Sequence, residues 1–260
     1  MREALGRIGV VAYTSWRGSL VGRRGLGLAL VAATYPLLVL AIGASRRTDI
    51  DLLAASELLY SALFLPVLLL LLCLVLGVSL FRGEIEDDTI VYPVSRSLPR
   101  ASLVVGKFTG FVVAALMFLV PAALLGAAFG AYLNVDPGVR LEGLEATLLV
   151  TTVLATVAYG AFFLLLGLLT RQALVIGLIY GFFWETFVPL LPGPLQDLTL
   201  IHYLRAIGGN LVTTGPLGEI GPPVSLATAV GVPLTFALLV LVVSCLYLGR
   251  AELRPEASPA

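Results

Sequence analysis

Six long apolar runs constrain the fold of this chain more than any other feature of its sequence. A helix needs about 20 mostly apolar residues to cross a bilayer, because its backbone polar groups must find partners within the helix. Segments of this kind occupy residues 26–44, 57–81, 104–133, 144–169, 173–191 and 224–248. Barrel strands would instead alternate apolar and polar residues over about 10 positions. The sequence therefore predicts an all-α integral membrane protein with six transmembrane helices in one domain, residues 1–260.

Composition supports this class and excludes others. Hydrophobic residues make up 59% of the chain and charged residues only 12%, whereas soluble domains carry about 25% charged residues. The formal net charge is zero, which gives no reason to expect nucleic acid as a partner. Both cysteines, Cys73 and Cys245, lie inside apolar runs. We interpret them as small hydrophobic residues and not as a disulfide pair or metal ligands.

Basic residues indicate which side of the membrane each loop occupies. Short cytoplasmic loops of membrane proteins carry an excess of lysine and arginine. Twelve of the sixteen bases lie before the first run, between the second and third, between the fourth and fifth, or after the sixth. The other three loops hold only Arg46, Arg47, Arg140 and Arg205. We therefore expect a multi-pass protein of the cell membrane, with both termini and the 81–107 loop in the cytoplasm.

The basic segment 1–25 predicts a helix that lies in the plane of the lipid headgroups. Its apolar residues recur at helical spacing, and its arginines lie off that stripe. We expect Trp16 at the interface, and Arg17, Arg23 and Arg24 on anionic lipid. A frayed cytoplasmic lead-in is the alternative. A cleaved signal peptide is disfavoured, because its removal would leave five spans and disrupt the charge pattern.

The loop between the fifth and sixth runs, Pro189 to Pro223, is rich in proline and glycine but retains many apolar residues. A solvated loop would not need them. We expect one or two short re-entrant helices that dip into the outer membrane face and are broken at Gly208–Gly209. Irregular backbone is tolerated at membrane depth only where protein buries it.

Glu185 is the one carboxylate inside a predicted span. A charge at the bilayer centre costs at least about 2.5–3.5 kcal/mol on insertion scales, so such residues face protein or a wet cavity. One interpretation is a proton or cation site. The interpretation that we favour is a buried hydrogen-bond anchor for the segment that follows.

A charged island, residues 81–107, separates the second and third runs. Four of the sixteen acids fall within five of its residues: Glu84, Glu86, Asp87 and Asp88. A solvated loop would account for them. A short cytoplasmic helix accounts for them better, because the macrodipole favours negative charge near a helix start, and Pro93 would then end it. Such a compact segment suits docking into a groove of a soluble partner, with apolar anchors at Ile85, Ile90, Val91 and Tyr92.

Catalytic and nucleotide-binding motifs are absent from the sequence. It contains no G-x-x-x-x-G-K-[ST] loop, no H-E-x-x-H and no G-x-S-x-G, which removes the usual signatures of ATP binding, zinc hydrolysis and serine hydrolysis. His202 is the only histidine, and we interpret it as a structural loop residue. We therefore expect the chain to be no enzyme and to bind neither metal nor cofactor itself.

The island resembles the signature of the type-2 exporter permeases of ABC transporters. It carries Glu84-Ile85-Glu86-Asp87-Asp88-Thr89-Ile90, then Pro93-Val94-Ser95-Arg96, then Gly106-Lys107. Asp88 stands where many members have glycine. The basic N-terminal helix, the six spans and the inward termini are also similar to that family.

This resemblance implies a function. Such permeases work as a dimer, with a second copy or a paralogue, on a dimer of separate ATPase subunits that bind ATP and Mg. The island would be the coupling helix, and the complex would export a substrate or extract it from the membrane. The residues expected to contact the ATPase are Glu84, Ile85, Glu86, Asp87, Asp88, Thr89, Ile90, Tyr92, Pro93 and Arg96. The alternative is an ATPase-driven scaffold, or mechanotransmitter, that acts on a partner protein without transporting a substrate.

Overall fold

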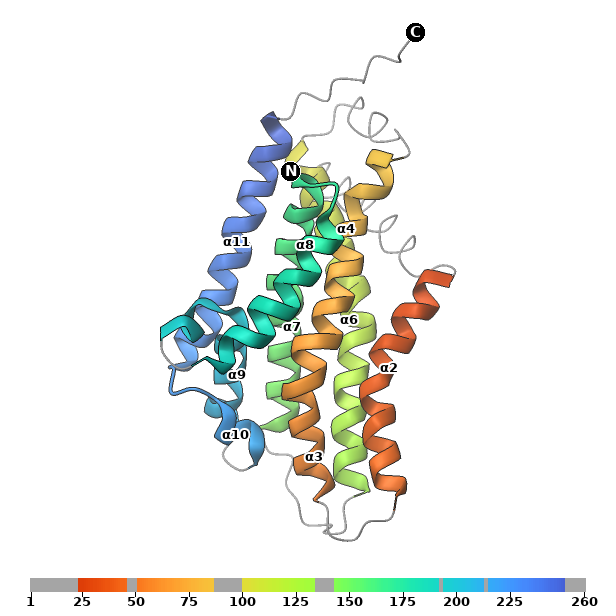
Figure 1. Ribbon diagram of the computed structural model, residues 1–260, viewed down its shortest axis with the longest axis vertical. Coiled ribbons are helices and arrows are strands. Elements are labelled where there is room, and N and C mark those ends of the chain that lie inside the picture. The colour runs from red at the N-terminus through yellow and green to blue at the C-terminus, as the bar shows by residue number, and fades with distance from the viewer. Residues whose placement is uncertain are drawn as a thin grey trace, which may run out of the picture.

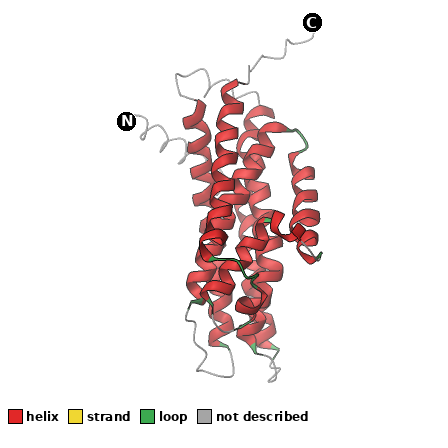
Figure 2. Cartoon of the chain, turned by 90° about the vertical axis from the view of Figure 1, so that its left-hand side faces the viewer, coloured by secondary structure: helices red, strands yellow, loops and turns green. Residues whose placement is uncertain are grey.

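The computed structural model of the chain describes residues 23–45, 51–86, 100–133, 143–191, 194–212 and 215–250. These residues are almost entirely helical, and none of them lies in a strand (Figure 2). The helices are α2 (Arg23–Ala44), α3 (Leu52–Leu59), η1 (Tyr60–Leu69), α4 (Leu70–Glu86), α6 (Arg100–Tyr132), α7 (Leu144–Leu169), α8 (Ala173–Ile179), η2 (Tyr180–Glu185), η3 (Val188–Leu190), η4 (Pro194–Leu198), α9 (Leu200–Leu211), α10 (Pro216–Ile220) and α11 (Leu226–Arg250). Of these, η1 and η2 are π-helices, and η3 and η4 are 3₁₀-helices.

Six helical stretches in the described part of the chain are long and apolar enough to cross a membrane, which confirms the predicted number. We call them spans 1 to 6: Gly25–Ala44, Leu52–Leu80, Ala101–Tyr132, Leu144–Leu169, Ala173–Leu190 and Leu226–Arg250. Span 2 begins five residues earlier than the apolar run predicted. The reason is Asp51, whose carboxylate accepts hydrogen bonds from the backbone N–H groups of Leu53 (3.0 Å) and Ala54 (3.2 Å) and so caps α3.

The spans run side by side along the long axis of the molecule (Figure 1). The end of α4, the start of α6, the junction of α7 with α8 and the end of α11 lie at one end of the bundle, which we call the island end. The end of α2, the start of α3 and the end of α6 lie at the opposite end. Successive spans therefore alternate in direction, as a chain that crosses a bilayer six times requires.

α7 is the central helix of the bundle. It packs against α4, α6, α8, α9, α11 and η1, and buried side chains occur along almost its whole length. α2 instead lies at the edge and packs mainly on α6. α6 approaches α2 closely at Gly126, where an added Cβ would clash with the Tyr35 ring, and it approaches α3 closely at Gly130, where an added Cβ would clash with the Ser56 side chain. Small residues four apart commonly permit such close packing of membrane helices, and here they are used within one chain.

Candidate functional site

The most densely bonded polar group among the described residues is the carboxylate of Glu185, the last residue of η2. Glu185 is 0% exposed. Its Oε2 accepts hydrogen bonds from the Tyr159 hydroxyl (2.9 Å) and the Ile201 backbone N–H (3.0 Å). Its Oε1 accepts from the Tyr180 hydroxyl (2.6 Å) and the Leu200 backbone N–H (3.3 Å). Four donors thus surround one buried carboxylate.

Two of those donors are the first backbone N–H groups of α9. The N–H groups of a helix's first turn have no partner within the helix, and the macrodipole places partial positive charge there. The residue before α9, Thr199, makes no capping bond with its own side chain. Glu185 therefore supplies the cap from a neighbouring span. This is the geometry of the anchor that the sequence led us to favour.

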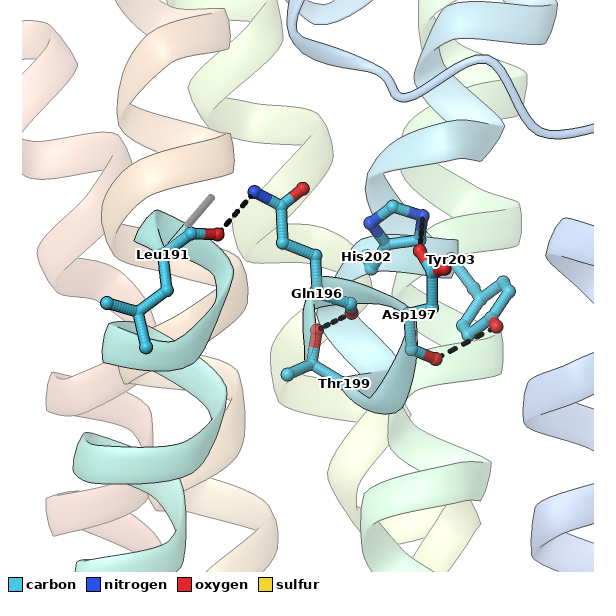
Figure 3. Close-up of polar contacts among 6 residues, drawn as sticks. All are labelled: Leu191, Gln196, Asp197, Thr199, His202 and Tyr203. Carbon is cyan, nitrogen blue, oxygen red and sulfur yellow. Dashed lines mark hydrogen bonds and ion pairs between the residues drawn. The ribbon is translucent and has the colours of Figure 1, made fainter. Parts of the chain in front are cut away.

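Local hydrogen bonds fix the turn that leads into α9 (Figure 3). The Thr199 hydroxyl donates to the Gln196 carbonyl (2.7 Å), and the Gln196 amide donates to the Leu191 carbonyl (2.8 Å). The Tyr203 hydroxyl donates to the Asp197 carbonyl (2.9 Å). His202 Nε2 lies 3.3 Å from Asp197 Oδ1, so the single histidine of the chain takes part in this turn.

Glu57 is a second buried carboxylate, and the sequence interpretation of it was wrong. We took Glu57, the first residue of the run 57–81, as an acid of the preceding loop, and we took Glu185 as the one carboxylate within a span. In the structure Glu57 lies in α3, inside span 2, and is 4% exposed. The cap at Asp51 extends the helix through it. A search for apolar residues alone therefore starts the span too late. The sequence signal for the true start was an Asp directly before an apolar, alanine-rich stretch, which is typical of a helix N-terminus.

The Glu57 carboxylate bonds to the segment that begins α10. Its Oε2 accepts from the backbone N–H of Leu217 at 3.0 Å. Gly215 lies against the same carboxylate with φ +105°, and a Cβ there would be 2.6 Å from Oε2. A left-handed φ and a carboxylate at this distance both require glycine. Glu57 and Glu185 therefore hold two successive helices of the loop between spans 5 and 6.

Those two helices also pack on each other. A Cβ on Gly208 of α9 would lie 2.8 Å from the Leu217 carbonyl oxygen, and one on Gly221 would lie 2.7 Å from the Cα of Gly209. The predicted break at Gly208–Gly209 was wrong, because α9 continues through both glycines to Leu211. The missing side chains let two backbones approach and do not end the helix.

Arg205 of α9 ties the same unit to span 2. Its Nη2 donates to the Ser61 carbonyl at 3.1 Å. Burial lowers the pKa of the Arg205 guanidinium, and the charge of Glu185 is among the influences that oppose this. Its Nε has no hydrogen-bond partner among the described residues. From the sequence we expected Arg205 only to be a basic residue of a loop on the outer side.

At the island end, one lysine joins two spans. Lys107 of α6 is 3% exposed, and its Nζ donates to the carbonyl oxygen of Leu80 in α4 at 2.6 Å. These two residues lie near the two ends of the 81–107 island. The bond therefore fastens α4 of span 2 to α6 of span 3 beside the island, before α4 ends at Glu86 and after α6 begins at Arg100.

The residues expected to contact an ATPase are only partly described. Glu84, Ile85 and Glu86 lie in the last turn of α4, so the expectation of Glu84 and Glu86 near a helix start was wrong. The physical reason is that α4 continues past the apolar run into the island. The remaining expected contacts lie outside the described residues: Asp87, Asp88, Thr89, Ile90, Tyr92, Pro93 and Arg96.

The helix expected at the lipid headgroups, residues 1–25, also lies almost entirely outside the described residues. Trp16 and Arg17 lie outside the described residues, and Arg23 and Arg24 are the first two residues of α2.

Within the residues that are described, no three His, Cys, Asp or Glu side chains gather as a metal site would require. The Glu57 and Glu185 carboxylates accept hydrogen bonds from backbone N–H groups of the same chain. Their contacts are therefore those of structural anchors.

Comparison with known proteins gives the family. No curated protein matches this sequence. The family model described as ABC-2 family transporter protein matches residues 29–207. The match begins within α2, ends within α9 and covers more than half of the chain, including Glu57, Lys107 and Glu185. The chain therefore belongs to the ABC-2 family of transporter proteins, as a multi-pass transmembrane permease.

Proposed function

We propose that this permease is the membrane subunit of an ATP-driven exporter and that its 81–107 island couples it to a separate ATPase subunit. In this proposal the ATPase binds ATP and Mg, and the permease exports a substrate or extracts it from the membrane. The permease would act with a second copy of itself or with a paralogue. It would lie in the plasma membrane with the island end and both termini in the cytoplasm.

Family membership supports this proposal, since ABC-2 permeases are the membrane components of transporters and not their ATPases. The observation that carries the coupling role is the hydrogen bond from Lys107 to the Leu80 carbonyl. Because this bond joins α4 to α6 at the root of the island, a force applied to the island acts on spans 2 and 3 together. A loop rooted on two independent helices would transmit such a force poorly.

Coupling also requires a difference in affinity. ATP can move the spans only if the island fits two states of the ATPase unequally. The acids from Glu84 to Asp88 give the island a charge pattern that a basic groove can recognise. The island end also carries the final turn of α11, with the basic residue Arg250.

The test is to purify the tagged chain from its native membranes and to measure which proteins and which ATPase activity come with it. We expect an ATPase subunit to co-purify, and we expect charge reversal of all four island acids to Lys to remove it. The matched control carries Glu145→Lys and Glu219→Lys. Both of these acids are exposed, Glu145 in the first turn of α7 and Glu219 in α10, and both helix segments lie away from the island end.

Three outcomes would count against the proposal. Absence of any ATPase from the preparation would contradict the partnership. An ATPase that stays bound and fully stimulated after charge reversal would contradict the role of the island. If the ATPase binds but no exported substrate can be found, and a second membrane or secreted protein is bound as well, the scaffold alternative would replace export.

A further inference from the structure

We propose that α9 and α10 form a strap that fastens span 2 to span 5 at the end of the bundle opposite to the island, so that these two spans move there as one body. The strap consists of Leu200–Leu211 and Pro216–Ile220. In Figure 1 both helices lie beside the spans, and not beyond their ends. The fastening itself follows from the hydrogen bonds, and its consequence for transport rests on the function proposed above.

The strap is held to span 5 by Glu185. The carboxylate is buried and accepts the N–H groups of Leu200 and Ile201. Tyr159 of span 4 and Tyr180 of span 5 donate to the same two oxygens. Undocking the strap would leave a buried carboxylate with half of its donors, which is strongly unfavourable.

The strap is held to span 2 at two points. Glu57 accepts the N–H of Leu217, and Arg205 donates to the Ser61 carbonyl. Glu57 and Ser61 lie four residues apart, one helical turn, so both ties reach the same face of span 2. One tie comes from α10 and the other from α9, which means that both helices of the strap are anchored to this span.

The two helices of the strap behave as one unit because their backbones are in contact. Gly208 lies against the Leu217 carbonyl, and Gly209 lies against Gly221. The Asn210 side chain also donates to the Val224 carbonyl at 2.8 Å, where the chain approaches span 6. A displacement of α10 therefore displaces α9, and the ties to spans 2 and 5 cannot open independently.

Both fastened spans contain a π-helix next to the tie. η1 begins three residues after Glu57, and Glu185 is the last residue of η2. η1 and η2 also pack against each other. π-helices are rare and persist where the surrounding structure holds them. The strap braces both irregular segments, so a change of tilt in the transport cycle has to be taken up elsewhere, toward the island end.

Hydrogen–deuterium exchange on the full-length chain in lipid nanodiscs tests the strap. The variants are Glu57→Gln and Glu185→Gln, which keep the side-chain volume and an acceptor oxygen. If the strap opens as one cooperative unit, each variant raises exchange by the same factor, about tenfold, in peptides from both α9 and α10. Arg205→Met removes the tie to Ser61 and leaves both carboxylates with their hydrogen-bond donors, and it should raise exchange in both helices as well.

Glu219→Gln is the matched control, because Glu219 is an exposed carboxylate on α10 itself, and it should leave exchange unchanged. The proposal is overturned if Glu57→Gln affects only α10 and Glu185→Gln affects only α9, since the two carboxylates would then be separate caps. The measurement needs no ATPase. Failure of the strap and failure of the proposed coupling are therefore distinguishable.

Discussion

The backbone N–H of Ile201 donates to the Glu185 carboxylate at 3.0 Å, so a helix of the loop between two spans starts on a charge supplied by the span before it. Glu57 has the same relationship to the segment that starts α10, although it lies 160 residues away in sequence from its partner Leu217. Carboxylates are costly in an apolar bundle, and here Glu185 accepts two backbone N–H groups and Glu57 accepts one. The permease thus uses its buried acids to hold the two helices of this loop against the apolar spans.

Removing the Glu185 carboxylate should destabilise the protein strongly. Glu185→Ala leaves two tyrosine hydroxyls and two backbone N–H groups without their acceptor in a buried site. We expect a loss of about 3 kcal/mol or more, and a smaller loss for Glu185→Gln, which keeps one acceptor oxygen. Thermal unfolding of the purified chain in nanodiscs measures this. Glu145→Ala is the control, because Glu145 is exposed on α7.

The same residue distinguishes an anchor from a charge carrier. An anchor needs an acceptor, whereas a proton or cation site needs a titratable charge. We therefore expect Glu185→Gln to keep assembly and transport close to wild type once the protein has folded. A variant that assembles normally but has lost transport altogether would support the charge-carrier interpretation instead.

Gly215→Ala should be among the more damaging single-methyl additions in the described chain. Its φ of +105° is unfavourable for any residue with a Cβ, and that Cβ would lie 2.6 Å from the Glu57 carboxylate. We expect destabilisation of about 1–3 kcal/mol. The matched control is Gly231→Ala in α11, where nothing lies within 4 Å of an added Cβ. There the higher helix propensity of alanine should give a gain of up to about 1 kcal/mol.

The close approach of α2 and α6 gives a further prediction. A Cβ at Gly126 would clash with the ring of Tyr35, which is fully buried and whose hydroxyl donates to the Ser56 carbonyl at 3.1 Å. Gly126→Ala should therefore cost about 1–3 kcal/mol through overpacking. Gly27→Ala in α2 meets nothing within 4 Å and serves as the control. If Gly126→Ala were as stable as the wild type, α2 would have to be free to move away from α6.

The number of spans could be predicted from the sequence because the bilayer demands a minimum apolar length. The start of span 2 could not, because hydropathy gives no sign that Asp51 caps a helix there or that Glu57 is buried within the span. Whether a polar residue extends a span depends on the partner that it meets. For Glu57 that partner is a backbone N–H from a distant loop.

The candidate site, like the spans, could be predicted only in part from the sequence. An isolated carboxylate in an apolar span requires partners, which is why Glu185 could be interpreted as an anchor. Its partners could not be identified, because tertiary packing and not local sequence brings Tyr159 and the start of α9 to it. Gly208–Gly209 shows the converse error. Adjacent glycines predict a break from their local flexibility, whereas here they form the contact surface on which α10 packs.

Lys107 offers the sharpest test of how the island is rooted. Lys107→Met keeps the apolar stem but removes the donor to the Leu80 carbonyl. A charged hydrogen bond of this kind contributes about 1.5–3 kcal/mol, so the stability should fall by that order. On the proposed function the ATPase should still co-purify, because its docking residues are unchanged, while its stimulation by the permease should fall several-fold. Arg250→Met, an exposed base at the same end, should change neither. Loss of ATPase binding in Lys107→Met would place Lys107 in the docking of the island and not in the transmission of force from it.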